Sequence, residues 1–289
     1  MPVVEYKVPQ SVDEAVGMLA ENENAKLLAG GTDLIIQNRS QTGPEVVLVD
    51  IKSIDALMGA SIDDDNLNLG PGMSCAEFTD REDIKSIFPG LVEAAYLIGS
   101  TQVQGRASVG GNLCNASPAA DTIPALMANK AICIIQGPAG ERQVAVEDFV
   151  TGVATNCMKH DEVLRVIQIA KPAKGTSDAY LRFIPRTEMD IAVAGAGVSL
   201  SLDSDGVCTA ARVAIGAVAP TAILVQEAAD ALIGTKLEES DLVAAGKAAS
   251  DAASPIDDRR ATAEYRTHVI GVLVKRAAAI AADRARSNG

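Results

Sequence analysis

The chain is organised around the stretch Ser108-Val-Gly-Gly-Asn-Leu-Cys-Asn-Ala-Ser-Pro-Ala-Ala-Asp-Thr122. Gly110 and Gly111 have no Cβ, so a rigid charged ligand can approach their main-chain N–H groups directly. Asp121 stands at the start of a helix that we expect to run to Ala128, because Asp and Pro are both common at helix openings. A glycine turn before a helix N-terminus suits an anionic or hydroxylated ligand, although a glycine pair alone is more often a simple tight turn.

A second glycine pair repeats this pattern near the N-terminus. The stretch Lys26-Leu-Leu-Ala-Gly-Gly-Thr-Asp-Leu34 places Gly30 and Gly31 between an apolar strand and two candidate N-caps, Thr32 and Asp33. Neither pair forms the G-x-G-x-x-G fingerprint or a P-loop. Two interpretations remain: both pairs are structural turns in a core of small residues, or together they hold the two ends of one long nucleotide.

Composition excludes several classes of function. Hydrophobic residues make up 48% and charged residues 22% of the 289 residues, as in soluble globular proteins with room for two domains. Aromatic residues make up only 3% and the net charge is −13, which argues against binding to nucleic acid or to an anionic membrane. No secretory signal and no membrane-spanning run is expected. Five scattered cysteines, an odd number, indicate reduced thiols and a cytoplasmic location.

The first part of the chain is expected to alternate strands and helices. Strands are predicted over residues 3–8, 25–29 and 45–51, with a capped helix over 11–21 and a short helix after Thr32. Residues 56–174 are expected to add strands near 66–69, 131–135, 143–146 and 162–169, and helices over 74–80 and 81–98. The second helix is expected to be interrupted at Pro89-Gly90, and residues 101–112 to form the glycine-rich entry. The Pro/Gly linker at 171–175 predicts a domain boundary.

The last third has a different pattern. Two paired strands, 191–202 and 208–215, are joined by the turn Asp203-Ser-Asp-Gly206. Pro220 is expected to open a helix over 222–233, Ser240 to cap one over 242–253, and Thr262 to begin a long one that ends near Ala285. The sequence therefore predicts an α+β protein.

Four motifs carry a resemblance to a known protein family, and this resemblance spans essentially the whole chain. They are Leu28–Asp33, Ala107–Asn112 with Ala116–Asp121, Arg186-Thr-Glu-Met-Asp-Ile-Ala192, and Asp258–Arg266. In this order they resemble the FAD-binding (medium) subunits of the molybdenum hydroxylases, such as aerobic carbon monoxide dehydrogenase and xanthine dehydrogenase. The resemblance implies an FAD-binding domain over residues 1–174, with subdomains at about 1–55 and 56–174. This domain is of the type shared with vanillyl-alcohol oxidase-like flavoproteins. A C-terminal α+β domain with a small antiparallel sheet and helices follows over 175–289.

The resemblance also implies which residues hold the cofactor. The pyrophosphate and adenosine side of FAD would lie along Leu27, Leu28, Ala29, Gly30, Gly31, Thr32, Asp33 and Leu34. The flavin or its linker would touch Val103, Ala107, Ser108, Gly110, Gly111, Asn112, Cys114, Asn115 and Asp121. Val163 and Leu164 would pack on the cofactor, and Arg182 would stand as a cationic residue near the flavin ring. Cys114 can equally be a small core residue, and Arg186 with Asp190 can equally form a structural ion pair.

No residues for chemistry other than cofactor binding stand out. The two histidines are far apart in sequence, the cysteines lack metal-ligand spacing, and no nucleophile has an evident base. We therefore expect no metal site and no catalytic residue in this chain, so a cofactor must carry any redox step.

The resemblance implies an oxidoreductase subunit in which FAD passes electrons from an iron–sulfur small subunit to NAD, a quinone or oxygen. A molybdopterin-binding large subunit would oxidise the substrate, in a hetero-oligomer such as a dimer of heterotrimers. This chain alone would be inactive on that substrate. The alternatives are a stand-alone FAD oxidase and a non-catalytic nucleotide-binding scaffold.

Overall fold

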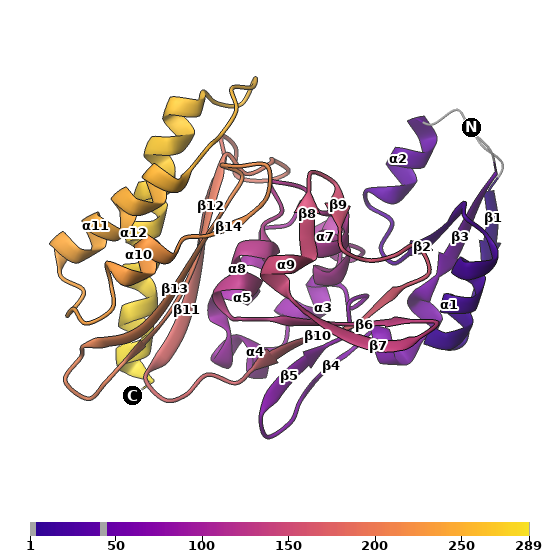
Figure 1. The fold of residues 1–289 in the computed structure, drawn as a ribbon, viewed down its shortest axis with the longest axis horizontal. Helices are drawn as coiled ribbons and strands as arrows, with labels where there is room; N and C mark the ends of the chain where they lie inside the picture. Colours follow the sequence, from indigo (N-terminus) through magenta and orange to yellow (C-terminus); the bar gives the residue numbers. More distant parts are fainter. Residues whose placement is uncertain (1–3, 41–44, 289) are drawn as a thin grey trace.

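Three larger β-sheets follow one another along the described part of the chain, each with its own hydrophobic core, and a small two-stranded sheet accompanies the second. The computed structural model describes residues 4–40 and 45–288. In Figure 1 the first sheet lies on the right in indigo, the second in the centre, and the third on the left under the yellow C-terminal helix. The predicted strand start at Val3 lies outside the described residues.

The first sheet is parallel and is sandwiched by two helices. Its strand order is β1-β3-β2, and every residue of β3 is buried, as its β-branched sequence predicts. Ser11 caps α1 by accepting a hydrogen bond from the N–H of Glu14, which confirms the predicted start of this helix. The elements are β1 (Val4–Lys7), α1 (Val12–Glu21), β2 (Ala25–Leu28), α2 (Leu34–Ser40) and β3 (Val46–Asp50).

The second sheet is antiparallel, in the order β4-β5-β10-β6-β7, and six short helices pack on it. Two 3-10 turns, Ile51–Ser53 and Asp55–Leu57, connect it to the first sheet. The strands are β4 (Ala60–Ile62), β5 (Asn66–Leu69), β6 (Ile132–Gly137), β7 (Gly140–Ala145) and β10 (Val163–Ala170). The helices are α3 (Cys75–Thr79), α4 (Glu82–Ile87), α5 (Pro89–Tyr96), α6 (Thr101–Gln104), α7 (Val109–Asn115) and α8 (Thr122–Ala128). A short helix α9 (Val146–Phe149) and the hairpin β8 (Val150–Gly152) and β9 (Thr155–Asn156) follow β7.

The third sheet is antiparallel, with the C-terminal helices on one face and α5 and α8 on the other. The turn at Gly206, which has φ +76°, joins its two long strands as the sequence predicts. The sheet consists of β11 (Thr176–Phe183), β12 (Ala194–Leu202), β13 (Cys208–Gly216) and β14 (Ile223–Leu224). The helices are α10 (Gln226–Asp230), α11 (Glu239–Ala252) and α12 (Ala263–Ser287).

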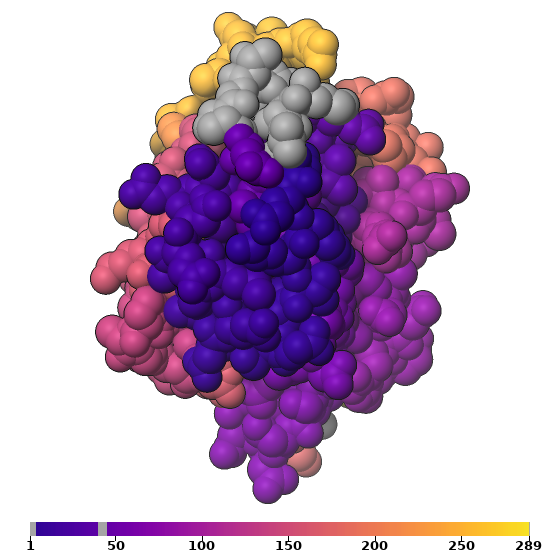
Figure 2. Space-filling model, turned by 90° about the vertical axis from the view of Figure 1, so that its right-hand side faces the viewer, coloured from indigo at the N-terminus to yellow at the C-terminus, as the bar shows by residue number. Residues whose placement is uncertain are grey.

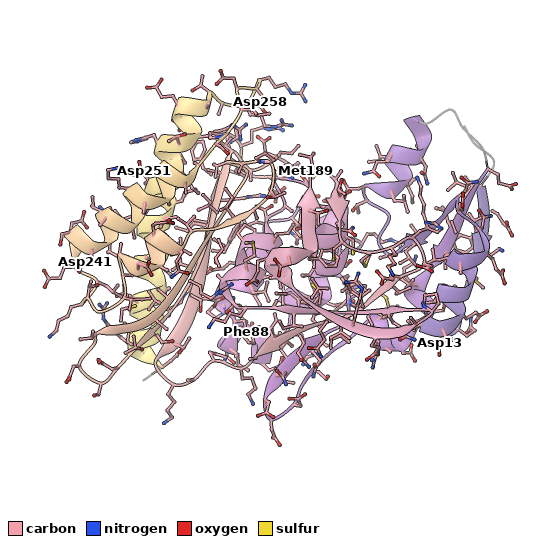
Figure 3. All side chains as sticks on the ribbon, in the orientation of Figure 1. Asp13, Phe88, Met189, Asp241, Asp251 and Asp258 are labelled. Carbon is pink, nitrogen blue, oxygen red and sulfur yellow. The ribbon has the colours of Figure 1, made fainter. Side chains whose placement is uncertain are left out.

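Hydrogen bonds and an ion pair join the second and third sheets. The carboxylate of Asp178 on β11 accepts hydrogen bonds from the N–H groups of Gly90 and Leu91 at 2.9 and 3.0 Å, at the start of α5. Glu93 of the same helix pairs with Arg284 of α12. Phe88, which directly precedes α5 and is labelled in Figure 3, is buried in the core of the second sheet. The third sheet is therefore fixed to the helices that surround α7 and α8.

Two predicted segments and one predicted helix cap are wrong. Residues 222–233 form the short strand β14 and the single-turn helix α10 in place of one helix. Glu238, not Ser240, caps α11, where it forms a capping box with Asp241. The glycine-rich entry predicted over residues 101–112 forms the short helix α6 and the first part of α7. The edge strand β11 was not predicted at all.

Candidate functional site

The two glycine pairs meet in the folded chain. A Cβ on Gly30 would lie 1.8 Å from the carbonyl oxygen of Arg106, so only glycine allows the loop after β2 to pack on the segment that leads into α7. Gly31 has φ +73°, which turns the chain from β2 into α2. Leu34 of α2 then packs on Leu28 and on β3. The first pair therefore both brings the two stretches together and starts α2.

The second glycine pair is helical. Ser108 is the N-cap of α7 and accepts a hydrogen bond from the N–H of Gly111 at 3.0 Å. A Cβ on Gly110 would lie 2.3 Å from Pro71, which shows how closely this helix packs on the chain before α3. A Cβ on Gly111 would meet only the Ser108 hydroxyl oxygen, at 3.0 Å, and otherwise open space. Gly110 is thus needed for packing, and Gly111 leaves room beside the helix.

That room belongs to a cavity of about 450 Å³ between the first two sheets. Figure 2 views the molecule from the side of the first sheet, whose indigo residues cover this end of the molecule. Gln37 of α2 donates to Asn115 at the end of α7 over 3.1 Å, so the walls of the cavity also touch each other. The cavity thus lies where the two glycine-containing segments meet.

Most of the residues predicted for the site line this cavity. They are Leu27, Ala29, Gly30, Gly31, Thr32, Asp33, Leu34, Ala107, Ser108, Gly110, Gly111, Asn112, Cys114, Asn115, Val163 and Leu164. Four do not. Leu28 is buried between the first sheet and α2, and Val103 packs on the core of the second sheet. Asp121 and Arg182 lie outside the cavity lining; Asp121 directly precedes Thr122, which donates two hydrogen bonds to Asn112 on the cavity wall.

Asp121 and Arg182 form a buried ion pair. Their side chains are 8% and 4% exposed and 2.8 Å apart, and the Tyr180 hydroxyl donates to the other carboxylate oxygen over 2.9 Å. Burial raises the pKa of Asp121 to about 6, while the nearby Arg182 charge opposes this shift. The Nε of Arg182 is buried and has no partner among the described residues. This pair holds the start of α8, one residue before Thr122.

The sequence reasoning missed one wall of the cavity. The segment between β9 and β10 contributes Asn156, Met158, Lys159, His160 and Glu162. Arg142 on β7 holds this segment by a two-point ion pair with Glu162 at 2.8 and 2.7 Å, which lowers the pKa of that carboxyl. These residues carry no local motif, so only their position directly before Val163 and Leu164 could have indicated them. The remaining wall residues are Leu19, Ala25, Lys26, Gln37, Ile51, Pro71 and Ile98.

The groups around the cavity suit binding better than catalysis. Burial raises the pKa of Cys114 to about 12, so its thiol is protonated and a poor nucleophile at neutral pH. Across residues 4–40 and 45–288, no three His, Cys, Asp or Glu side chains are placed to hold a metal ion. Arg186 and Asp190 form an ion pair at 3.2 Å, one of the two roles predicted for them. No helix in the described part of the chain is long and apolar enough to cross a membrane.

A large nucleotide cofactor fits these walls. Lys26, Lys159 and His160 line the cavity, where the Lys26 amine donates to Asn38 and the His160 ring bonds the Asn22 carbonyl oxygen. The exposed Gly111 lets a ligand reach α7 without meeting a side chain. Apolar residues at Leu27, Val163 and Leu164 offer surface to a flat ring. Polar and apolar groups contribute to this lining in comparable measure, which suits a ligand that carries both charged phosphates and a flat ring.

Comparisons with known proteins point to one family. Residues 2–172 match the model of the FAD binding domain in molybdopterin dehydrogenase, and residues 179–281 match the CO dehydrogenase flavoprotein C-terminal domain. The chain is 30% identical to the 6-hydroxypseudooxynicotine dehydrogenase complex subunit alpha of Paenarthrobacter nicotinovorans, over 99% of this chain and 96% of the relative. It is 30% identical to the xanthine dehydrogenase FAD-binding subunit of Escherichia coli O157:H7, over 94% of this chain and 93% of the relative.

A solved structure matches the whole fold. It is that of the carbon monoxide dehydrogenase from Hydrogenophaga pseudoflava that lacks the Mo-pyranopterin moiety of the molybdenum cofactor. The TM-score is 0.93 at 32% identity, and the match covers 98% of both chains.

Proposed function

Because the chain belongs to the family that carries the FAD-binding domain of molybdopterin dehydrogenases, we propose that it is the electron-transfer subunit of a multisubunit molybdenum hydroxylase. The observation that carries the proposal is the meeting of the two glycine pairs at one cavity. When bound there, FAD supplies chemistry that the side chains lack, since it accepts electrons from an iron–sulfur partner and releases them to NAD, a quinone or oxygen.

Different residues of the cavity hold different parts of FAD. The loop from Ala29 to Asp33 holds the pyrophosphate and adenosine side, because its glycines let the main chain approach a ligand closely. Residues 107–115 hold the flavin and its linker, and Val163 and Leu164 pack on the cofactor. Lys159 and His160 add polar groups on the side that the sequence reasoning missed. Asp121 and Arg182 act from outside the cavity lining by fixing the start of α8.

The division of the chain supports the same proposal. Residues 1–174 form the FAD-binding domain, with subdomains at about 1–55 and 56–174 that carry the first and second sheets. This domain is of the vanillyl-alcohol oxidase type. Residues 175–289 form the C-terminal domain. The cavity between the first two sheets is the cofactor site of that architecture.

The partners of the subunit follow from the chemistry that it lacks. A small iron–sulfur subunit supplies electrons and a large molybdopterin-binding subunit oxidises the substrate, in a hetero-oligomer such as a dimer of heterotrimers. The five cysteines are all unpaired, which supports a cytoplasmic location. The relatives described above belong to a 6-hydroxypseudooxynicotine dehydrogenase, a xanthine dehydrogenase and a carbon monoxide dehydrogenase, so the same type of subunit serves enzymes with different substrates.

The isolated chain, loaded with FAD, should oxidise none of these substrates. The expected result is reduction of the flavin by an artificial donor such as dithionite, and no turnover of a purine, an aldehyde, an N-heterocycle or carbon monoxide. The reason is that the cavity offers a cofactor site and no group to activate a carbon centre. The measurement compares turnover by the pure chain, free of iron and molybdenum by elemental analysis, with turnover by the complex purified from the same cells. Equal rates would refute the electron-transfer role and favour a stand-alone oxidase.

A further inference from the structure

Asn112 of α7 lies on the cavity wall, and its amide has a fixed orientation. Its side-chain oxygen Oδ1 accepts two hydrogen bonds from Thr122, one from the hydroxyl at 2.6 Å and one from the backbone N–H at 3.3 Å. A backbone N–H can only donate, so the atom of Asn112 that faces it must be the oxygen. The NH₂ group of Asn112 is therefore turned away from Thr122.

The turned-away NH₂ group is free to bind a ligand. Among residues 4–40 and 45–288 it donates to no protein acceptor, while Asn112 lines the cavity. An amide group so placed presents two N–H donors and no acceptor to a molecule in the cavity. The complementary partner is an oxygen acceptor of the cofactor.

Thr122 can bind Asn112 because the side chain of Asp121 does not cap the start of α8. The first N–H groups of a helix have no partner within the helix, and a residue such as Asp at the N-cap commonly accepts from them. Here the Asp121 side chain makes no such bond, because its oxygens bind Arg182 and Tyr180. The N–H of Thr122, on a fully buried residue, is satisfied by Asn112 instead.

We propose that Thr122 is a positioning residue, which holds the Asn112 amide so that its NH₂ group donates to an oxygen of FAD. The inference rests on the proposed function, since it takes FAD as the ligand of the cavity. Thr122 itself does not line the cavity and acts only through Asn112.

The test is a double-mutant cycle on FAD binding, with the apoprotein titrated by FAD and the flavin fluorescence recorded. Thr122→Val, which keeps the shape and removes the hydroxyl, should weaken FAD binding about fivefold, and Asn112→Ala about tenfold. Thr122→Ser retains the hydroxyl and should stay within about twofold of wild type. In the Asn112→Ala background Thr122→Val should have no further effect, because the group that it positions is already gone.

A purely structural role gives a different pattern. Thr122→Val would then weaken binding equally with and without Asn112, and that result would overturn the inference. Equal binding by wild type and Thr122→Val would overturn it too, and would leave the proposed function intact. Wild-type protein that bound no FAD would overturn both.

Asn112→Asp tests whether the Asn112 amide donates to FAD, without changing any residue of α8. The carboxylate can still accept from Thr122, but it offers an oxygen to the cavity where the wild type offers N–H donors. FAD should bind more weakly to this variant than to Asn112→Ala, because two acceptors would face each other in place of one empty position. Tighter binding by Asn112→Asp than by Asn112→Ala would contradict a donor role.

Discussion

Gly111→Val should abolish FAD binding while the chain stays folded. A Cβ at this position meets only the Ser108 hydroxyl oxygen, at 3.0 Å, so a small shift of that hydroxyl lets the helix accept a side chain. The added methyl groups would occupy cavity space beside α7 that the cofactor needs. Displacing a ligand from such contact is expected to cost about 3 kcal/mol or more, which is about a hundredfold in the dissociation constant. The measurement is titration of the apoprotein with FAD.

Gly17→Val is the matched control for this variant. Gly17 is also an exposed glycine within a helix, and a Cβ there meets nothing within 4 Å. It does not line the cavity, although the neighbouring Leu19 does. The control should bind FAD as the wild type does, with a circular dichroism spectrum like that of Gly111→Val. Unchanged FAD affinity in folded Gly111→Val would show that the cofactor does not lie against α7.

Arg182→Met should have the largest effect on stability, because it leaves the Asp121 carboxylate buried without its cation. Removing one partner of a buried ion pair typically lowers the free energy of unfolding by about 3–5 kcal/mol. Urea denaturation of the apoprotein measures this loss. The exposed pair Lys247 and Asp251 on α11, where Asp251 is labelled in Figure 3, provides the control, and Lys247→Met should leave the unfolding curve unchanged.

The loss caused by Arg182→Met should also depend on pH. The pKa of Asp121 is already raised in the folded wild type, from 3.8 to about 6, so its contribution to stability is greatest below 3.8 and falls as the pH rises to about 6. Without Arg182 the pKa rises further, and the fall continues to higher pH. The destabilisation relative to wild type is therefore expected to be larger at pH 8 than at pH 5. A loss that is equal at both pH values would show that Asp121 is not the group left unpaired.

Elements whose signals are local could be predicted from the sequence. Ser11 caps α1, Thr262 caps α12, and the turn that ends at Gly206 joins β12 to β13, as their residue types predict. The apolar run of β3 is buried as expected, and Pro89 begins α5 where the helical segment was expected to break. In each case the neighbouring residues alone favour one conformation.

Elements that depend on tertiary contacts could not be predicted. Two adjacent glycines disfavour a helix, yet α7 forms, because Ser108 caps it and Gly110 must lie against Pro71. The edge strand β11 forms by pairing with β12, and Asp178 within it binds the start of α5. A polar residue such as Asp178 gives no strand signal on its own.

The site shows the same division. The resemblance predicted that residues within 27–34 and 107–115 hold the same cofactor. The structure places nearly all of these predicted residues on one cavity. The resemblance could not supply the wall at 156–162, whose position depends on the ion pair between Arg142 and Glu162. Nor could it show that Asp121 and Arg182 bind each other outside the cavity lining.

The most direct test of the account is to identify the flavin that the purified chain carries. The protein is denatured with acid, the precipitate is removed, and the flavin in the supernatant is identified by chromatography and quantified against protein. If the chain binds FAD non-covalently, free FAD is expected in an amount equimolar with the chain. Flavin that stays with the precipitated protein, FMN in place of FAD, or no flavin from a folded native complex would contradict non-covalent binding of FAD.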